Sequence, residues 1–298
     1  MKTQSIAAKT GVGPVEIAVT DGDRALRFYS DYVGLQPLVS EGPEIRMGAG
    51  GREVVVLHPG AERPVEPKTS GLYHLAIVLP DRRELARVIA RLGQLGWDQY
   101  PTDHVMTKAN YLWDPDGNGI EIYVESPEDG TMGMVNGTYG AWDKDGRPRS
   151  GRDPIDMKEL FGHLTEKDRT RDGLFAPMPE GTKMGHVHLH VADVGDALRF
   201  YVDLVGFDVM GKMPGVGFIS AGGYHHHLGL NEWAGHGARP AAPGSAGLHR
   251  FTVELPTKRD LDDVVGRLEH GEIGLSEEAD GYVALDPSSN RVLFRAAG

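Results

Sequence analysis

The 298-residue chain contains no cysteine and carries a formal net charge of −12 at pH 7. The absence of cysteine excludes disulfide bonds, thiolate-bound zinc and a cysteine nucleophile. The acidic balance argues against a nucleic-acid partner, because a basic face could not easily outweigh it. No apolar run approaches the roughly 18 residues needed to span a bilayer, and the first residues lead into no signal-peptide core. We therefore expect a cytoplasmic protein without a membrane partner.

The chain contains an internal repeat. Residues 25–29 recur unchanged at 197–201, and the Gly-Leu and Leu-Pro pairs of segment 71–80 recur at 247–256. An offset of 172 to 176 residues therefore maps one half onto the other. The length suits two domains of ordinary size, and the composition, 40% hydrophobic and 25% charged, is typical of globular proteins.

The hydrophobic pattern divides the chain into four modules, each a strand, a helix and a run of short strands. We expect residues 10–126 to form a first domain from modules one and two, and residues 183–298 to form a second domain from modules three and four. Residues 127–182 are rich in Gly, Asp, Lys and Arg and predict a connector, with one helical stretch near 157–164. Capping boxes at 81–84 and 257–260 predict the starts of the second and fourth helices.

Three residues that could bind a metal, His74, Glu121 and His186, have no equivalent ligand in the other repeat. The residues aligned with them are, in the same order, Arg250, Leu293 and Pro14. Each half thus keeps the polar groups that the other lacks, which predicts one site shared between the halves. Modules two and three would close together into the active cup, and a swap between subunits would satisfy the same pattern.

Four segments carry a resemblance to a known family: 71–76, 111–121, 185–190 and 221–231. Together they resemble the extradiol catechol dioxygenases (catechol 2,3-dioxygenases) of the vicinal-oxygen-chelate, or glyoxalase/bleomycin resistance/dioxygenase, superfamily. The resemblance covers nearly the whole chain apart from the connector. It implies an α+β fold in which four βαβββ modules pair into two cupped sheets.

The resemblance implies a non-haem Fe(II) site with His74, Glu121 and His186 as ligands. Mn(II) would fit the same donors, so iron follows from the resemblance and not from geometry. Strand alternation places Glu121 on the face opposite its apolar neighbours, toward the cup. His186, His188 and His190 alternate on one strand and share a face, so geometry alone leaves open which of them binds metal. The resemblance selects His186.

The histidine triplet 225–227 precedes an apolar strand. The resemblance implies that His226 is an acid–base group, because a neutral imidazole can take a proton from a catechol and later return it. Strand alternation would turn His225 and His227 to the opposite face, with at least one of them structural. We also expect His225 to contribute to substrate binding; a metal-binding surface loop is the alternative for the triplet.

Tyr111 precedes Glu121 by ten residues, as a pocket tyrosine precedes the glutamate ligand in the family. Its phenol could donate a hydrogen bond to the substrate oxygen, although a core aromatic is the alternative. The resemblance also implies that His104 supports catalysis and that His188 lines the substrate pocket.

These features predict extradiol (meta) cleavage of catechol or a substituted catechol with O2 at Fe(II), giving a 2-hydroxymuconic semialdehyde-type product. The expected partners are the catechol, O2 and further copies of the chain in a homo-oligomer. A glyoxalase-like metal-dependent isomerase is a second possibility, but it would want a further carboxylate where Leu293 stands. A metal-free ligand-sequestering protein on the same fold is a third.

Overall fold

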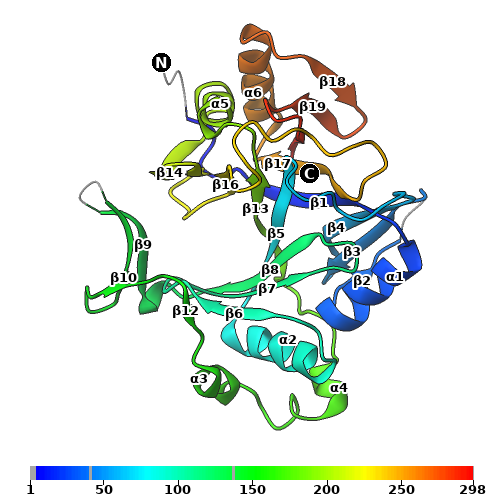
Figure 1. Ribbon diagram of the computed structural model, residues 1–298, viewed down its shortest axis with the longest axis vertical. Coiled ribbons are helices and arrows are strands. Elements are labelled where there is room, and N and C mark those ends of the chain that lie inside the picture. Colours follow the sequence, from blue (N-terminus) through cyan, green and yellow to red (C-terminus); the bar gives the residue numbers. More distant parts are fainter. Residues whose placement is uncertain (1–4, 40–41, 136–137, 298) are drawn as a thin grey trace.

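The protein, described by a computed structural model over residues 5–39, 42–135 and 138–297, is an α+β structure. Two large sheets are flanked by helices, and a smaller three-stranded sheet projects from one side (Figure 1). The large sheets are built from four strand–helix–three-strand modules, as the sequence predicts.

The larger sheet joins module two to module three, and we call it the 2–3 sheet. Its strand order is β12-β6-β7-β8-β5-β13-β16-β15-β14. Module two supplies β5 (Gly71–Leu79), β6 (Tyr100–Asp103), β7 (Thr107–Trp113) and β8 (Gly119–Glu125). Module three supplies β13 (Lys183–His190), β14 (Asp208–Met213), β15 (Val216–Ser220) and β16 (Leu228–Asn231). The modules meet where β5 and β13 pair antiparallel, with His74 opposite His188.

The other large sheet, the 1–4 sheet, has the order β18-β19-β20-β17-β1-β4-β3-β2. Module one supplies β1 (Gly11–Val19), β2 (Gln36–Pro37), β3 (Ile45–Ala49) and β4 (Arg52–Pro59). Module four supplies β17 (Gly247–Leu255), β18 (Leu275–Glu278), β19 (Gly281–Leu285) and β20 (Arg291–Ala296). The predicted closure of modules two and three is confirmed, and here it occurs within one chain. The halves 10–126 and 183–298 therefore each contribute to both sheets.

Each module carries one main helix, and the predicted caps are present. The helices are α1 (Gly22–Arg27) continuing as the π-helix η1 (Phe28–Val33), α2 (Arg82–Gln94), α5 (Val194–Leu198) continuing as the π-helix η3 (Arg199–Val205), and α6 (Lys258–His270). Asp81 accepts the backbone N–H of Glu84 at 3.0 Å, and Thr257 accepts that of Asp260 at 3.2 Å. None of the helices in the described ranges has the length and apolar character needed to cross a bilayer.

An arginine ties the two helices of each half together. On α2, Arg91 donates to the carbonyl of Tyr32 at the end of η1, at 2.9 Å. On α6, Arg267 donates to the carbonyl of Leu204 near the end of η3, at 2.8 Å. These carbonyls have no partner inside their own helix, so a guanidinium satisfies them well. Helices therefore pack within each half, whereas the pairs β5–β13 and β1–β17 join strands of opposite halves.

The connector forms structure of its own. It begins with the 3-10 turn η2 (Pro127–Asp129) and contains a three-stranded sheet, β9 (Gly130–Val135), β10 (Thr138–Asp143) and β11 (Pro148–Arg149). The short β12 (Asp153–Pro154) then adds to the edge of the 2–3 sheet beside β6. The helical stretch predicted near 157–164 is α3 (Met157–Gly162), and α4 (Arg171–Leu174) follows.

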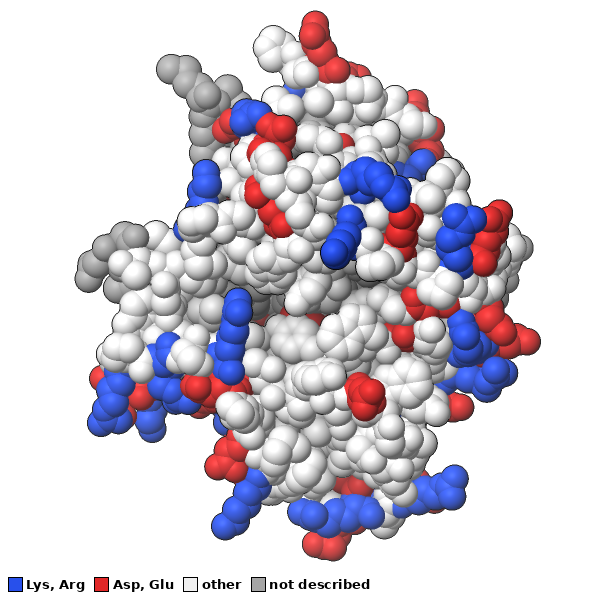
Figure 2. Space-filling model, viewed as in Figure 1, with Lys and Arg blue, Asp and Glu red and all other residues white. Residues whose placement is uncertain are grey.

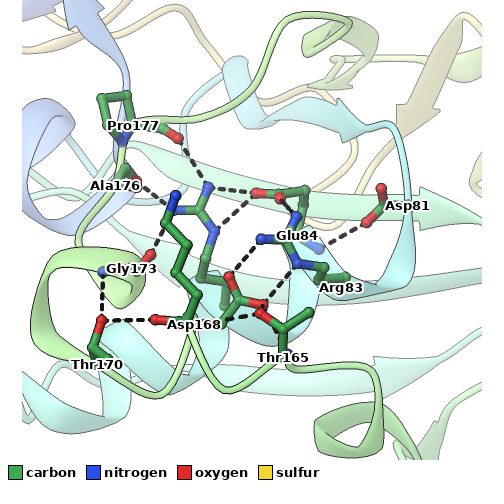
Figure 3. Close-up of polar contacts among 11 residues, drawn as sticks. Asp81, Arg83, Glu84, Thr165, Asp168, Thr170, Gly173, Ala176 and Pro177 are labelled. Atoms are coloured by element: carbon green, nitrogen blue, oxygen red, sulfur yellow. Dashed lines mark hydrogen bonds and ion pairs between the residues drawn. The ribbon is translucent and has the colours of Figure 1, made fainter.

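Arginines of α2 hold the end of the connector against module two (Figure 3). Arg83 Nη2 lies 2.5 Å from Asp168 Oδ1, and the Asp168 residue is only 1% exposed. Arg87, also buried, donates to the carbonyls of Gly173 at 3.2 Å and Pro177 at 2.9 Å. Arginine side chains of α2 thus anchor the connector by donating to its backbone carbonyls and to Asp168, in addition to the strand pairing of β12.

Candidate metal centre and its cavity

Three neighbouring strands of the 2–3 sheet bring together His74 from β5, Glu121 from β8 and His186 from β13. Glu121 Oε2 lies 3.0 Å from Nε2 of His74 and 3.1 Å from Nε2 of His186. All three residues are at most 5% exposed. Two of them come from the first half and one from the second, so the repeat with complementary losses does assemble one cluster.

The donor atoms of this cluster are spaced as the ligands of one metal ion would be. Ligand atoms at right angles, each about 2.1 Å from an ion, lie about 3 Å apart. Nε2 of His74 is buried and forms no hydrogen bond with the described residues, although it lies beside the Glu121 carboxylate. A buried donor set of two imidazoles and one carboxylate with an unsatisfied nitrogen fits a divalent metal of the iron or manganese type.

Charge at the cluster favours an ionised Glu121 and a neutral His186. Burial by itself raises the pKa of Glu121, but His186 and His74 outweigh it and hold that pKa well below its usual range. Burial lowers the pKa of His186, and Glu121 only partly opposes this effect. These are the protonation states in which both residue types bind metals.

The cluster opens into a cavity of about 760 Å³. Its lining includes apolar and aromatic side chains from three parts of the chain: Met106, Met132, Tyr139, Met210, Phe218 and Trp233. The viewed face is hollowed near its centre, and most side chains around that hollow are uncharged (Figure 2). A pocket of this size and character suits a small aromatic molecule.

His188 faces the cavity beside the cluster, as predicted. It is 5% exposed, and its Nε2 has no hydrogen-bond partner among the described residues. Burial holds its pKa well below the ordinary value, so the ring is neutral. Gly229 pairs with His188 across the strands, and a Cβ at Gly229 would lie 2.7 Å from the His188 ring. Glycine therefore leaves room for this ring, while His190 is held by Asn231 at 2.7 Å.

The side chains of the histidine triplet 225–227 do not alternate between two faces as expected for a strand. His225 and His226 both line the cavity, and the His226 ring centroid is 4.1 Å from that of His186. His227 turns away, and its Nδ1 accepts the backbone N–H of Ala221 at 3.2 Å. The expectation that His225 faces away from His226 was wrong, because β16 begins only at Leu228 and strand alternation does not apply before it.

Tyr111 and His104 form a fixed pair at the wall of the cavity. His104 Nδ1 lies 2.5 Å from the carbonyl of Gly151, and its Nε2 lies 2.8 Å from the Tyr111 hydroxyl. A carbonyl can only accept, so Nδ1 carries a proton, and Nε2 is the ring nitrogen that faces the Tyr111 hydroxyl. Tyr111 pairs in register with Glu121 across β7 and β8. Burial, with added effect from Glu121, raises the pKa of Tyr111 well above its usual value.

The connector contributes residues that the sequence analysis did not assign. Met132, Tyr139 and Arg152 all line the cavity, and the Tyr139 ring stacks on Phe218 at 5.5 Å. The alternation of Met132 and Met134 with smaller residues is a strand signal that could have predicted an apolar wall here. Its polar composition made the segment look like a linker only.

At the position aligned with His74, the 1–4 sheet carries an arginine in place of the histidine. Arg250, aligned with His74, lies with its Nε 2.5 Å from Glu16 Oε1 and its Nη1 2.6 Å from Glu278 Oε2. His58 also approaches Glu16, at 2.7 Å. The guanidinium supplies a fixed positive charge there and would oppose a divalent cation beside it.

Sequence comparison assigns the chain to a family. The model of the Glyoxalase/Bleomycin resistance protein/Dioxygenase superfamily matches residues 11–122 and 183–292. The chain belongs to this superfamily. It is also 36% identical over 292 residues to a catechol-2,3-dioxygenase of Bacillus subtilis (strain 168), with 96% of each chain covered. The resemblance noted in the sequence is confirmed.

Solved structures of the superfamily share this fold. A candidate dioxygenase from Bacillus subtilis subsp. subtilis str. 168 superposes with a TM-score of 0.64 at 13% identity, covering 99% of this chain and 86% of that one. Glyoxalase I from Zea mays gives a TM-score of 0.55 at 13% identity, covering 96% and 92%. At such identities the likeness supports the superfamily fold alone.

Proposed function

We propose that this superfamily member is a non-haem iron(II) extradiol dioxygenase that cleaves the ring of a catechol with O2. One observation carries the proposal: two imidazoles and one carboxylate meet with 3.0 and 3.1 Å spacings at the end of a 760 Å³ aromatic-lined cavity. The full-length likeness to a catechol-2,3-dioxygenase supports the same chemistry.

His74, Glu121 and His186 would hold the metal on one side and leave its other side facing the cavity. When bound, Fe(II) supplies a Lewis-acidic centre that can take the diol and O2 side by side and exchange electrons with them. Two neutral imidazoles and one carboxylate leave a divalent ion with a net charge of +1. A diol that has lost one proton balances this charge.

His226 is the group we assign to proton transfer. Burial, with smaller effects from neighbouring histidines, holds its pKa well below the ordinary value, so the ring is neutral and its nitrogen lone pair is free to face a substrate proton. Within the described chain it has no hydrogen-bond partner, and it lines the cavity next to His186. It can therefore take a proton from the diol and return it to the product.

Tyr111 and His188 are the groups we assign to hydrogen bonding of the reacting oxygens. The Tyr111 oxygen is held by His104 at 2.8 Å, and its proton can turn from His104 to a substrate oxygen. His188 presents a buried Nε2 with no partner in the described ranges. Both are fixed before substrate arrives, which lowers the cost of ordering them.

Two other functions are less well supported. A glyoxalase-like isomerase would want a further carboxylate ligand, but Glu121 is the sole Asp or Glu among the described residues that line the cavity. A metal-free binding protein would not need the closely spaced donors of the cluster. Measured metal content separates that case from both enzymes.

The decisive experiment loads the purified protein with Fe(II) or Mn(II) without oxygen, then adds catechol in air. The expected result is a yellow ring-cleavage product, with one O2 consumed per catechol. Glu121→Gln, treated identically, is the matched control and should give neither product nor oxygen uptake. A fully metal-loaded wild-type protein that leaves both catechol and substituted catechols intact would reject the proposal.

A further inference from the structure

The cavity contains one fixed positive charge that the reaction proposed above does not use. Among the described residues that line it, Arg152 is the only Lys or Arg and Glu121 the only Asp or Glu. The Arg152 side chain is exposed and has no ion-pair or hydrogen-bond partner within the described ranges. An unpaired guanidinium on the wall of a substrate cavity is available to a ligand.

The backbone at Arg152 is positioned by contacts that lead to the metal cluster. The carbonyl of the preceding residue, Gly151, accepts from His104, which in turn holds Tyr111. The N–H of Arg152 donates to Ser150 Oγ at 3.0 Å. Directly afterwards, Asp153 begins β12 and pairs with the edge of the 2–3 sheet. The connector therefore presents Arg152 at a defined place on the cavity wall.

The charge of Arg152 reaches Tyr139 on the same wall of the cavity. Burial raises the pKa of Tyr139 to about 12 against the opposing charge of Arg152. The positive field of this side chain thus extends over the space where a substrate ring would lie.

The sum of the charges in the occupied cavity indicates which kind of substrate it accommodates. A divalent ion, Glu121 and a singly deprotonated diol sum to zero, so Arg152 leaves the occupied cavity with one positive charge. A catechol without a charged substituent would leave the guanidinium unpaired. A ring carboxylate would neutralise it, and the planar guanidinium can hold a carboxylate through two parallel hydrogen bonds.

We propose that Arg152 selects catechols that carry an anionic substituent, a carboxylate on the ring or on a short side chain, an inference that rests on the proposed ring-cleavage function. The diol binds at the His74–Glu121–His186 cluster, and the carboxylate pairs with Arg152 at the connector wall. Arg152 is thus a specificity-determining residue supplied by the connector.

The test compares kcat/KM for 3,4-dihydroxybenzoate and 3,4-dihydroxyphenylacetate with kcat/KM for catechol, in the iron-loaded enzyme. The wild type should prefer at least one of the carboxylated substrates. Arg152→Gln should lower that preference about tenfold, the scale of one charged hydrogen-bonding contact. The preference should also weaken with added salt, because the guanidinium is exposed.

Arg147→Gln is the matched control, because it removes the same charge from the connector at an exposed residue that pairs with Asp145 and does not line the cavity. It should leave the preference unchanged. Equal losses on all substrates in Arg152→Gln, or no wild-type preference, would overturn the inference.

Binding without oxygen separates this inference from the proposed function. The dissociation constant of 3,4-dihydroxybenzoate for the metal-loaded protein should rise about tenfold in Arg152→Gln, with or without turnover. Selective binding without ring cleavage would reject the dioxygenase proposal and retain the role of Arg152. Ring cleavage with equal binding of 3,4-dihydroxybenzoate by wild type and Arg152→Gln would retain the dioxygenase proposal and reject the role of Arg152.

Discussion

At the scale of single residues, the structure places a small buried cluster where complementary losses between two repeats predict it. His74, Glu121 and His186 each look unremarkable alone, since a histidine or glutamate on a strand usually has a structural role. Their partners in the other repeat, Arg250 among them, cannot form the same set. The lack of metal-binding residues at the aligned positions of the other repeat was therefore more informative than His74, Glu121 and His186 taken one by one.

We predict that His186→Ala lowers bound metal from near one per chain to near zero while the fold survives. The physical reason is that two remaining donors, His74 and Glu121, cannot hold a divalent ion tightly. Metal analysis and circular dichroism of the purified variant measure the two effects. His190→Ala, the same change on the same strand, removes a histidine that bonds Asn231 and should leave metal content unchanged. Full metal occupancy in His186→Ala would contradict the ligand assignment.

We predict that His226→Phe keeps its metal but loses turnover by about a hundredfold, the usual scale for a positioned acid–base group. Phenylalanine keeps an aromatic ring beside His186 and removes both ring nitrogens, one of which would move the proton. Steady-state kinetics on metal-loaded protein measure the loss. His249→Phe, an exposed histidine of the 1–4 sheet, is the control and should turn over normally. Normal activity in His226→Phe would move the role to His188.

The residues that sequence could not place are those whose orientation depends on irregular backbone. Strand alternation fixes the side of Glu121 and of His188 correctly. It fails at His225, because the segment before β16 is not a strand. It also says nothing about Arg152, whose place depends on a sheet that only the folded chain forms.

At the scale of elements, the connector is held by side chains of α2. Arg83 binds Asp168, and this contact, together with hydrogen bonds from Thr165, keeps the pKa of Asp168 well below its usual range. A carboxylate with a depressed folded-state pKa stabilises the protein at pH values above the unfolded value of about 3.9. That contribution disappears as the pH falls through the folded-state value.

We predict that Asp168→Asn lowers the free energy of unfolding by about 2 kcal/mol at pH 7, the scale of a buried charged hydrogen bond. The difference from wild type should begin to shrink as the pH falls below about 4, where the carboxylate of the unfolded chain takes up a proton, and should vanish only as the pH falls through the lower folded-state value. Urea unfolding at several pH values measures it. Asp262→Asn, which removes an exposed partner of Lys258, should cost well under 1 kcal/mol. A difference independent of pH would contradict the ionic explanation.

Helix starts were predictable because the caps are local. Asp81 and Thr257 bond within their own first turns, so the sequence alone identifies them. The connector strands were missed because their stability comes from tertiary contacts, such as Tyr139 on Phe218, that a single sequence does not display.

At the scale of the whole molecule, sheets and helices connect the halves in different ways. Strands pair between halves in both large sheets, whereas Arg91 and Arg267 tie helices within each half. The pairing of modules two and three was predictable from ligand complementarity. Once modules two and three are paired, modules one and four are the only ones left to pair with each other. The packing between the two sheets could not be predicted from ligand complementarity or from this elimination.

We predict that neither half binds metal alone. Residues 1–126 contain His74 and Glu121, and residues 183–298 contain His186, so each fragment lacks part of the cluster. The two fragments, expressed separately and titrated with Fe(II) without oxygen, should each bind far more weakly than the intact chain. One tightly bound ion per isolated fragment would show that the cluster is not shared.

Because β5 and β13 are neighbours in one sheet but belong to opposite halves, the order of synthesis matters. When module two leaves the ribosome, the strand that must pair with β5 has not been made, and the whole connector comes first. The nascent chain thus carries an open sheet edge and an incomplete ligand set until β13 emerges. We expect metal to be acquired late, by a chain that is already nearly complete, so that a truncated product neither captures iron nor reacts with oxygen.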